Sequence, residues 1–175
     1  VRDYVPGDSF SRIHWPSTAR TGKLMVKDFK IHPSGEVWVI LDLHKDAQAG
    51  TGVEGTEEQA ITIAASLVRH YLEANHSVGI LAQGSSRLLI TPQRGRHSLW
   101  RMLEALALIR AEGNIPLDLL LSQEAGKFGY WSNLVVITSL GRGLDAPLLH
   151  QIQPRGARTT VIVLEASTFG GEGGS

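Results

Sequence analysis

Short runs of apolar, often β-branched residues alternate along the chain with longer segments in which apolar residues recur at helical spacing. The run from Val37 to Asp42 is apolar until its last residue, and a similar pattern returns from Asn133 to Thr138 and from Thr159 to Leu164. A run of this kind is typical of a strand that is covered on both faces. Because parallel neighbours require long right-handed crossovers, the alternation predicts an α/β fold with a doubly wound, mostly parallel sheet.

The segments between these runs predict amphipathic helices. Thr56-Glu57-Glu58-Gln59 has the spacing of a capping box at the start of the first helix. Gly113 is expected to stop the second helix, and Pro116 to stand at the first turn of the third. The predicted helices are Glu57 to Glu73, Leu99 to Ile109, Leu117 to Glu124 and a segment near Ala146 to Gln153.

Two further apolar runs lie close together, from Ser77 to Ala82 and from Arg87 to Thr91. The connection Gln83-Gly84-Ser85-Ser86 contains glycine and serine, which suit a tight turn. We therefore expect two adjacent antiparallel strands, the second of which ends at Pro92.

The first 33 residues differ in character from the rest. Pro6-Gly7 is a turn signal, Asp8 is expected to cap a short helix containing Ile13 and Trp15, and Lys23 to Ile31 alternates like a strand. The predicted parts of the chain are an N-terminal arm packed on the domain (1–33), one α/β domain (34–168) and a flexible glycine-rich tail (169–175).

Charge and residue types narrow the classes of function. Lys plus Arg and Asp plus Glu number 17 each, so no global field attracts nucleic acid or an anionic bilayer. The absence of cysteine excludes disulfides, zinc-thiolate sites and thiol nucleophiles. No apolar run reaches the roughly 18 residues that span a bilayer, so we expect the chain as given to be soluble. Since it begins without methionine, we also expect it to be a piece of a longer protein.

The arm carries the most specific pattern in the chain. It reads Arg2-Asp3-Tyr4-Val5-Pro6-Gly7-Asp8, then Arg12-Ile13-His14-Trp15, Thr18-Ala19-Arg20 and Leu24-Met25-Val26-Lys27. This series resembles the signature of the bacterial domain-of-unknown-function family fifty-eight, whose members are similar to von Willebrand factor A domains. The resemblance covers nearly the whole chain. The arm residues that carry it include Arg2, Tyr4, Pro6, Gly7, Asp8, Arg12, Trp15 and Arg20.

The resemblance implies a cellular setting. Family members look like membrane proteins with two apolar helices before this region, and they are often encoded beside MoxR-type AAA ATPases. It therefore implies a membrane-anchored parent, a location at the cytoplasmic face of the bacterial inner membrane, and an AAA ATPase as the protein partner.

The resemblance also implies where a binding site lies. Ligands of open parallel sheets lie beyond the carboxyl ends of the strands. Von Willebrand factor A domains hold Mg²⁺ there with an Asp-x-Ser-x-Ser loop, a threonine from a second loop and commonly an aspartate from a third, which together supply hard oxygen ligands.

This sequence departs from that ligand set. In Asp42-Leu43-His44-Lys45-Asp46 only the first ligand position is kept, and the Lys45 ammonium opposes a cation. After Thr138-Ser139, Leu140 stands where the family pattern has an aspartate. The sequence thus predicts a degenerate metal-ion-dependent adhesion site without a metal or cofactor. The residues left at its edge are Asp42, His44, Asp46, Thr56, Thr138 and Ser139.

Two interpretations of the first loop stay open. Asp42, His44 and Asp46 suit a transition metal such as Mn²⁺ or Zn²⁺, which would make the chain a metal-dependent, hydrolase-like enzyme. Alternatively, Asp42 caps backbone donors at the sheet edge while His44 and Asp46 lie on a solvated loop. We favour the second interpretation, which predicts a non-catalytic protein-interaction domain; a domain that only shapes a membrane complex is a third possibility.

Other constellations are weaker signals. Arg94, Arg96 and Arg101, with His97 and Trp100, suit a local anion or nucleic-acid patch, but the neutral chain argues against nucleic acid as a partner.

Two catalytic patterns are incomplete in this sequence. Gly50 to Gly55 resembles a phosphate cradle, but it lacks the Gly-Lys-Ser/Thr ending and carries Glu54, which repels phosphate. Ser139 lacks the Gly-x-Ser-x-Gly elbow that exposes a nucleophile.

Overall fold

The chain divides into two compact units, 1–33 and 34–175. The computed structural model describes residues 2–3, 19–20, 25–26, 35–139 and 157–165. In the first unit, β1 (Arg2–Asp3) pairs antiparallel with β2 (Met25–Val26), which falls within the strand predicted from Lys23 to Ile31. The rest of that strand and the predicted helix after Asp8 lie outside the described residues. The packing of the arm on the domain stays a prediction.

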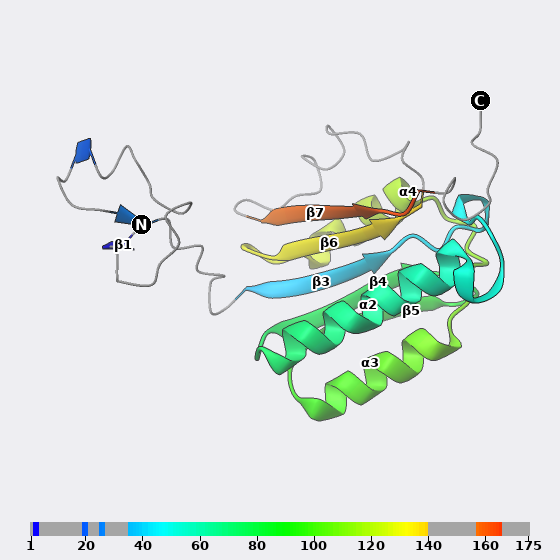
Figure 1. Cartoon of the computed structure of the whole chain (residues 1–175), viewed down its shortest axis with the longest axis horizontal. Coiled ribbons are helices and arrows are strands. Elements are labelled where there is room, and N and C mark those ends of the chain that lie inside the picture. Colours follow the sequence, from blue (N-terminus) through cyan, green and yellow to red (C-terminus); the bar gives the residue numbers. More distant parts are fainter. Residues whose placement is uncertain (1, 4–18, 21–24, 27–34, 140–156, 166–175) are drawn as a thin grey trace. The chain divides into compact units, whose positions relative to one another are not determined.

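Five strands of the second unit form one sheet (Figure 1). They are β3 (Glu36–Leu41), β4 (Ser77–Gln83), β5 (Arg87–Gln93), β6 (Asn133–Thr138) and β7 (Arg158–Val163). The order is β5-β4-β3-β6-β7, and only the edge pair β4 and β5 is antiparallel. The predicted doubly wound, mostly parallel sheet is therefore confirmed.

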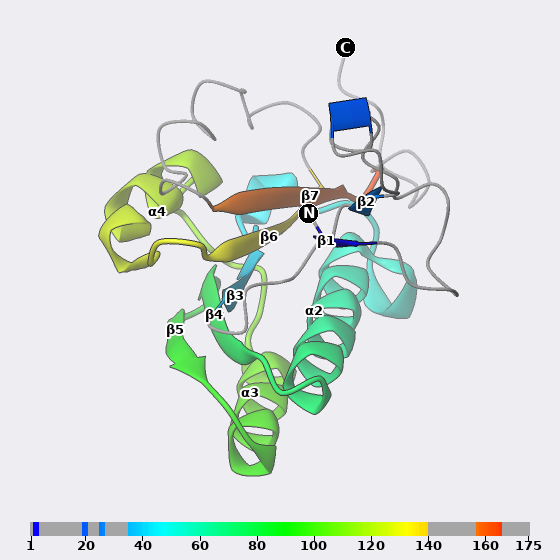
Figure 2. The same ribbon diagram turned by 90° about the vertical axis from the view of Figure 1, so that its left-hand side faces the viewer.

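Helices cover both faces of this sheet (Figure 2). They are α2 (Thr56–Glu73), α3 (Arg96–Leu108) and α4 (Leu117–Glu124), with 3-10 turns η2 (Lys45–Ala47), η3 (Gly52–Glu54) and η4 (Ala125–Lys127). Helices α2 and α3 pack on one face and α4 on the other. The helix predicted near Ala146 to Gln153 lies outside the described residues. Within the part of the chain that the structure describes, no helix is long and apolar enough to cross a membrane.

The central strand β3 joins the two layers of the core. Val37, Val39 and Leu41 pack toward α2 and α3, whereas Trp38 and Ile40 pack toward α4. This division follows from the alternation of side chains along a strand. All five side chains are at most 1% exposed, and complete burial of an aliphatic side chain stabilises a fold by roughly 1.5–3 kcal/mol. The apolar run therefore requires cover on both faces.

The start of α2 differs from the sequence prediction. Gly55 is the N-cap residue, and no side chain caps the helix. The predicted capping box is therefore wrong: the Thr56 hydroxyl bonds to the preceding loop instead, at Gln48 and Ala49. A hydroxyl that finds a tertiary partner is no longer available to the helix end.

Two other element ends also differ. Helix α3 ends at Leu108, before Gly113, because Ile109 is already extended. Strand β5 continues through Pro92 to Gln93, so the prediction that Pro92 ends it is wrong. Proline is tolerated there because β5 is an edge strand, and its pairing with β4 shifts register near this point.

Gly113 joins the chain after α3 to the end of β3. Its N–H donates to the Leu43 carbonyl at 3.0 Å, and its carbonyl accepts from the Lys45 N–H at 3.0 Å. A Cβ at this position would lie 2.0 Å from the Gln83 carbonyl oxygen and 2.9 Å from that of Leu43. Backbone atoms at the end of β4 and just after β3 would have to move to accommodate it, so the position requires glycine.

We expect Gly113→Ala to lower the free energy of unfolding by about 1–3 kcal/mol, the usual effect of forcing atoms into a packed region. Gly126→Ala is the matched control, because a Cβ there meets nothing within 4 Å. The control should change stability by less than about 1 kcal/mol. Urea unfolding at constant m-value measures both, and equal stability of the two variants would contradict the close approach at Gly113.

Candidate functional site

The candidate site lies where the strand order reverses. The chain leaves β3 for β4 on one side and later returns to β6 on the other, so the carboxyl ends of β3 and β6 form the switch point of the sheet. Ligand sites of open α/β sheets form at such a point because the loops diverge there. The Asp42 N–H donates to the Ile137 carbonyl at 2.9 Å, which continues the ladder past the end of β3.

The Asp42 carboxylate is buried and both of its oxygens accept hydrogen bonds. The Thr138 hydroxyl donates to Oδ2 at 2.7 Å, and the His44 N–H donates to Oδ1 at 3.2 Å. Asp42 is 5% exposed and Thr138 is 2% exposed. A buried carboxylate needs such donors, since burial without partners is costly. Asp42 therefore links the end of β3 to the end of β6 through Thr138. Its second hydrogen bond, from the His44 N–H, bends the chain that follows β3.

His44 caps the turn η2 through its ring. Its Nδ1 accepts a hydrogen bond from the Asp46 N–H at 3.2 Å, and the side chain is 17% exposed. The Asp46 carboxylate lies 3.9 Å from the same nitrogen, and this side chain is 77% exposed. In this geometry Nδ1 faces a backbone donor.

Gln48 is the site residue that the sequence did not single out. Its amide nitrogen donates to the carbonyls of Asp42 (3.1 Å) and His44 (3.3 Å), and its amide oxygen accepts from the Thr56 hydroxyl at 2.8 Å. Thr56 in turn accepts from the Ala49 N–H at 2.8 Å. One amide thus connects both ends of the loop from 42 to 56, here named the Asp42 loop. The spacing of Gln48 from its partners follows no motif, so no sequence signal marked it.

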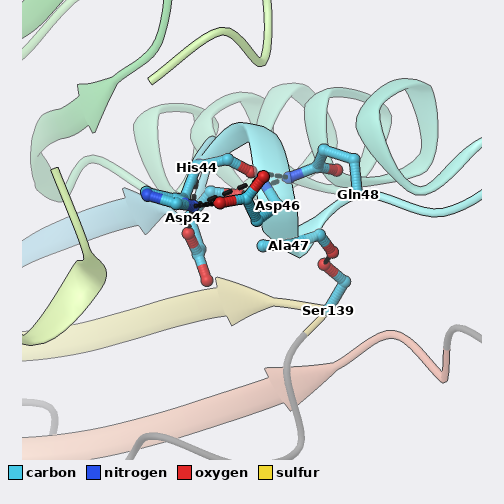
Figure 3. Close-up of polar contacts among 6 residues, drawn as sticks. All are labelled: Asp42, His44, Asp46, Ala47, Gln48 and Ser139. Carbon is cyan, nitrogen blue, oxygen red and sulfur yellow. Dashed lines mark hydrogen bonds and ion pairs between the residues drawn. The ribbon is translucent and has the colours of Figure 1, made fainter. Parts of the chain in front are cut away.

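Ser139 ties the Asp42 loop to the end of β6. Its hydroxyl donates to the Ala47 carbonyl (Figure 3), and the side chain is buried. Figure 3 shows Ser139 approaching Ala47 from the end of β6, while Asp42, His44 and Gln48 lie on the loop itself. The structure therefore brings Asp42, His44, Thr138 and Ser139 together, as a set of loop-closing contacts.

Thr56 lies at the far end of the loop, where it contacts Gln48 and Ala49. Asp46 lies at the exposed side. Leu140 lies outside the described residues. Of the arm residues, Arg2 lies in β1 and Arg20 is exposed. The arm positions outside the described residues are Tyr4, Pro6, Gly7, Asp8, Arg12 and Trp15.

The side chains at this edge do not fit magnesium. Octahedral Mg²⁺ needs several oxygens free to point at one centre. Asp42 is engaged through both oxygens, the Ser139 hydroxyl is directed at a backbone carbonyl, and His44 brings a nitrogen where an oxygen would be needed. Over the described ranges, no three His, Cys, Asp or Glu side chains gather in a metal-binding arrangement.

The tip of the Asp42 loop is exposed although its base is closed. Lys45 and Asp46 project at one turn, and residues 50–54 form a second projection around η3. Val53 in this second projection is 82% exposed. The Gly55 N–H donates to the Gly52 carbonyl, and the Thr56 N–H donates to the Ala49 carbonyl, each at 2.9 Å, so backbone bonds hold the projection in shape.

Comparison with known proteins gives relatives in sequence and in fold. The uncharacterized protein YeaD of Bacillus subtilis is 27% identical over 165 residues, which are 93% of this chain. The chain spans 38% of the length of that relative.

Two solved structures share the fold. An aerotolerance-related membrane protein from Bacteroides fragilis aligns at a TM-score of 0.55 and 18% identity, covering 73% of this chain and 66% of that one. Proximal thread matrix protein 1 from the mussel byssus aligns at 0.53 and 11% identity, covering 74% and 38%. These likenesses and the strand order agree with the predicted α/β fold with a doubly wound, mostly parallel sheet. Since the family described as "Protein of unknown function DUF58" matches residues 1–166, this chain belongs to the DUF58 family, the one that its arm resembles.

Proposed function

We propose that this chain is a non-catalytic protein-interaction domain that recognises its partner with the exposed tip of the Asp42 loop. The partner that the family resemblance implies is a MoxR-type AAA ATPase, and the parent protein would hold the domain at the cytoplasmic face of the inner membrane. The observation that carries the proposal is the engagement of both Asp42 carboxylate oxygens in loop-closing hydrogen bonds.

The internal bonds of the loop favour recognition by a folded surface. Gln48 connects its two ends, and Ser139 anchors its middle at Ala47. A loop that is already ordered loses little conformational entropy on binding, and this raises affinity without extra contacts. Loops on a rigid sheet edge commonly carry binding functions for this reason.

The exposed residues of the tip suit a protein partner. Val53 presents an apolar side chain next to Glu54 in one projection, and Lys45 and Asp46 add exposed charges of both signs at the other. A small apolar centre with a charged rim is the usual composition of a protein interface. Phosphate is disfavoured at the second projection because Glu54 lies in it.

The proposal requires Asp42 and Thr138 to act as a structural pair. We expect Thr138→Val to lower the free energy of unfolding by about 1–3 kcal/mol, because it leaves a buried carboxylate oxygen without its donor. Thr138→Ser keeps the hydroxyl and should lose less. Combining Thr138→Val with Asp42→Ala should lose less than the sum of the single changes, and strict additivity in urea unfolding would contradict the pairing.

The proposal also predicts that divalent cations leave the melting temperature unchanged. A ligand bound only by the folded state would stabilise it by about 2.7 kcal/mol at a hundred times its dissociation constant, which is a shift of several degrees. Thermal unfolding with millimolar MgCl₂ or MnCl₂ measures this. A rise of several degrees that disappears in Asp42→Asn would favour the alternative, a metal-dependent enzyme that uses Asp42, His44 and Asp46.

Partner binding is tested with a substitution at the loop tip. The chain should retain a purified MoxR-type ATPase in a pull-down, and Val53→Asp should abolish retention because it places a charge at the apolar centre of the contact. Leu108→Asp is the matched control, since Leu108 is a similarly exposed apolar residue on α3. Absence of a complex in every nucleotide state, or equal loss with both variants, would contradict the proposal.

A further inference from the structure

A second exposed surface lies at the opposite edge of the sheet from the Asp42 loop. Helix α2 begins at the carboxyl end of the parallel strands and runs back, and β5 returns to pair Gln93 with Val78 at the start of β4. The end of α2 and the start of α3 therefore lie together at the amino edge (Figure 1). This surface is separate from the loop considered above.

Positive charge gathers at this edge. Arg94, Arg96, His97 and Arg101 fall within eight residues that contain no acid, and all four are exposed. Together with Trp100 they are here named the α3 basic patch. Basic residues at a helix start oppose the helix dipole, which is unfavourable for the fold. Arg101 donates to the Gln93 amide oxygen at 3.2 Å, which is one structural contact of the patch. Residues that break a local rule of the fold are expected at functional surfaces.

A hollow of about 320 Å³ opens beside this patch. It is lined by Leu72, Glu73, Gly95, Arg96 and Leu99. Leu72 and Leu99 supply apolar walls large enough to receive an aliphatic side chain. The acid in the lining, Glu73, accepts from Arg69 at 2.9 Å, so its charge is already balanced and the net charge of the rim stays positive.

An exposed aromatic side chain lies on the same helix as Arg96 and Leu99, two residues that line the hollow. Trp100 is 67% exposed and follows Arg96 by one helical turn, so the two share a face of α3. Tryptophan and arginine are the residues most enriched in the energetic centres of protein interfaces. An apolar hollow, an exposed tryptophan and several arginines thus lie at one helix end.

We propose that the α3 basic patch binds an acidic segment of a protein partner. Carboxylates of the segment would pair with Arg96 and Arg101, and an apolar side chain between them would enter the hollow beside Trp100. The arginines favour a segment with carboxylate side chains, since arginine pairs with carboxylates in bidentate geometry. The apolar hollow favours a peptide over a nucleic-acid backbone, as does the zero net charge of the chain, because nucleic-acid affinity depends on many phosphate contacts.

The test uses fluorescence anisotropy with a short labelled peptide in which glutamate and leucine alternate. The intact chain should bind it, and binding should weaken as salt is raised. The combined change Arg96→Glu and Arg101→Glu should reduce affinity by at least about tenfold, and Trp100→Ala should reduce it also. The same peptide with glutamine in place of glutamate should not bind.

The control is the combined change Arg110→Glu and Arg158→Glu, which alters the net charge equally at exposed positions outside both the patch and the Asp42 loop. It should leave affinity unchanged, and circular dichroism melts should show that all variants fold. Equal loss in the control, no peptide binding at about 1 mM, or tighter binding of a thymidine oligonucleotide through the same arginines would each overturn the proposal. None of these outcomes depends on the ATPase or on the Asp42 loop.

Discussion

The hydrogen bond from the Thr138 hydroxyl to the Asp42 carboxylate holds together the loops at the carboxyl ends of the parallel strands. It joins the ends of β3 and β6, two parallel strands that are adjacent in space and 96 residues apart in sequence. Because Asp42 follows a fully buried strand, its carboxylate is carried into a region with little water. Donors must meet it there, and both the next loop and the neighbouring strand supply one.

The same constraint applies to the other polar side chains of the Asp42 loop. A magnesium site would need several oxygens left free to point at the ion. Here a histidine ring caps a turn, Gln48 bridges three partners, and Ser139 reaches a backbone carbonyl. Polar groups at the switch point hold one another, which gives a rigid loop with an exposed tip. A rigid loop lowers the entropy cost of the protein binding proposed above, whereas a metal would need unsatisfied ligands.

The two surfaces proposed for binding lie at opposite ends of the parallel strands, and their chemistry differs. The Asp42 loop presents an isolated apolar residue among charges of both signs, whereas the α3 basic patch combines one sign of charge with an apolar hollow. A domain with two such ends can connect two partners, or two parts of one partner, because the sheet between them is stiff. The core of β3 and its flanking helices provides that stiffness.

Much of the architecture was determined by the sequence alone, because a buried strand must be apolar along its whole length and a covering helix must be apolar along one stripe. The runs that became β3 and β6 and the stripes of α2 and α4 were predicted in this way, as was the family from the arm. Tertiary structure alone decided what the polar side chains do. Thr56 has the spacing of a cap but bonds to Gln48, and Gln48 acquires its role only when the loop closes. Helical periodicity is a local property, whereas a hydrogen-bond partner is whichever group the fold brings near, and local sequence does not specify that group.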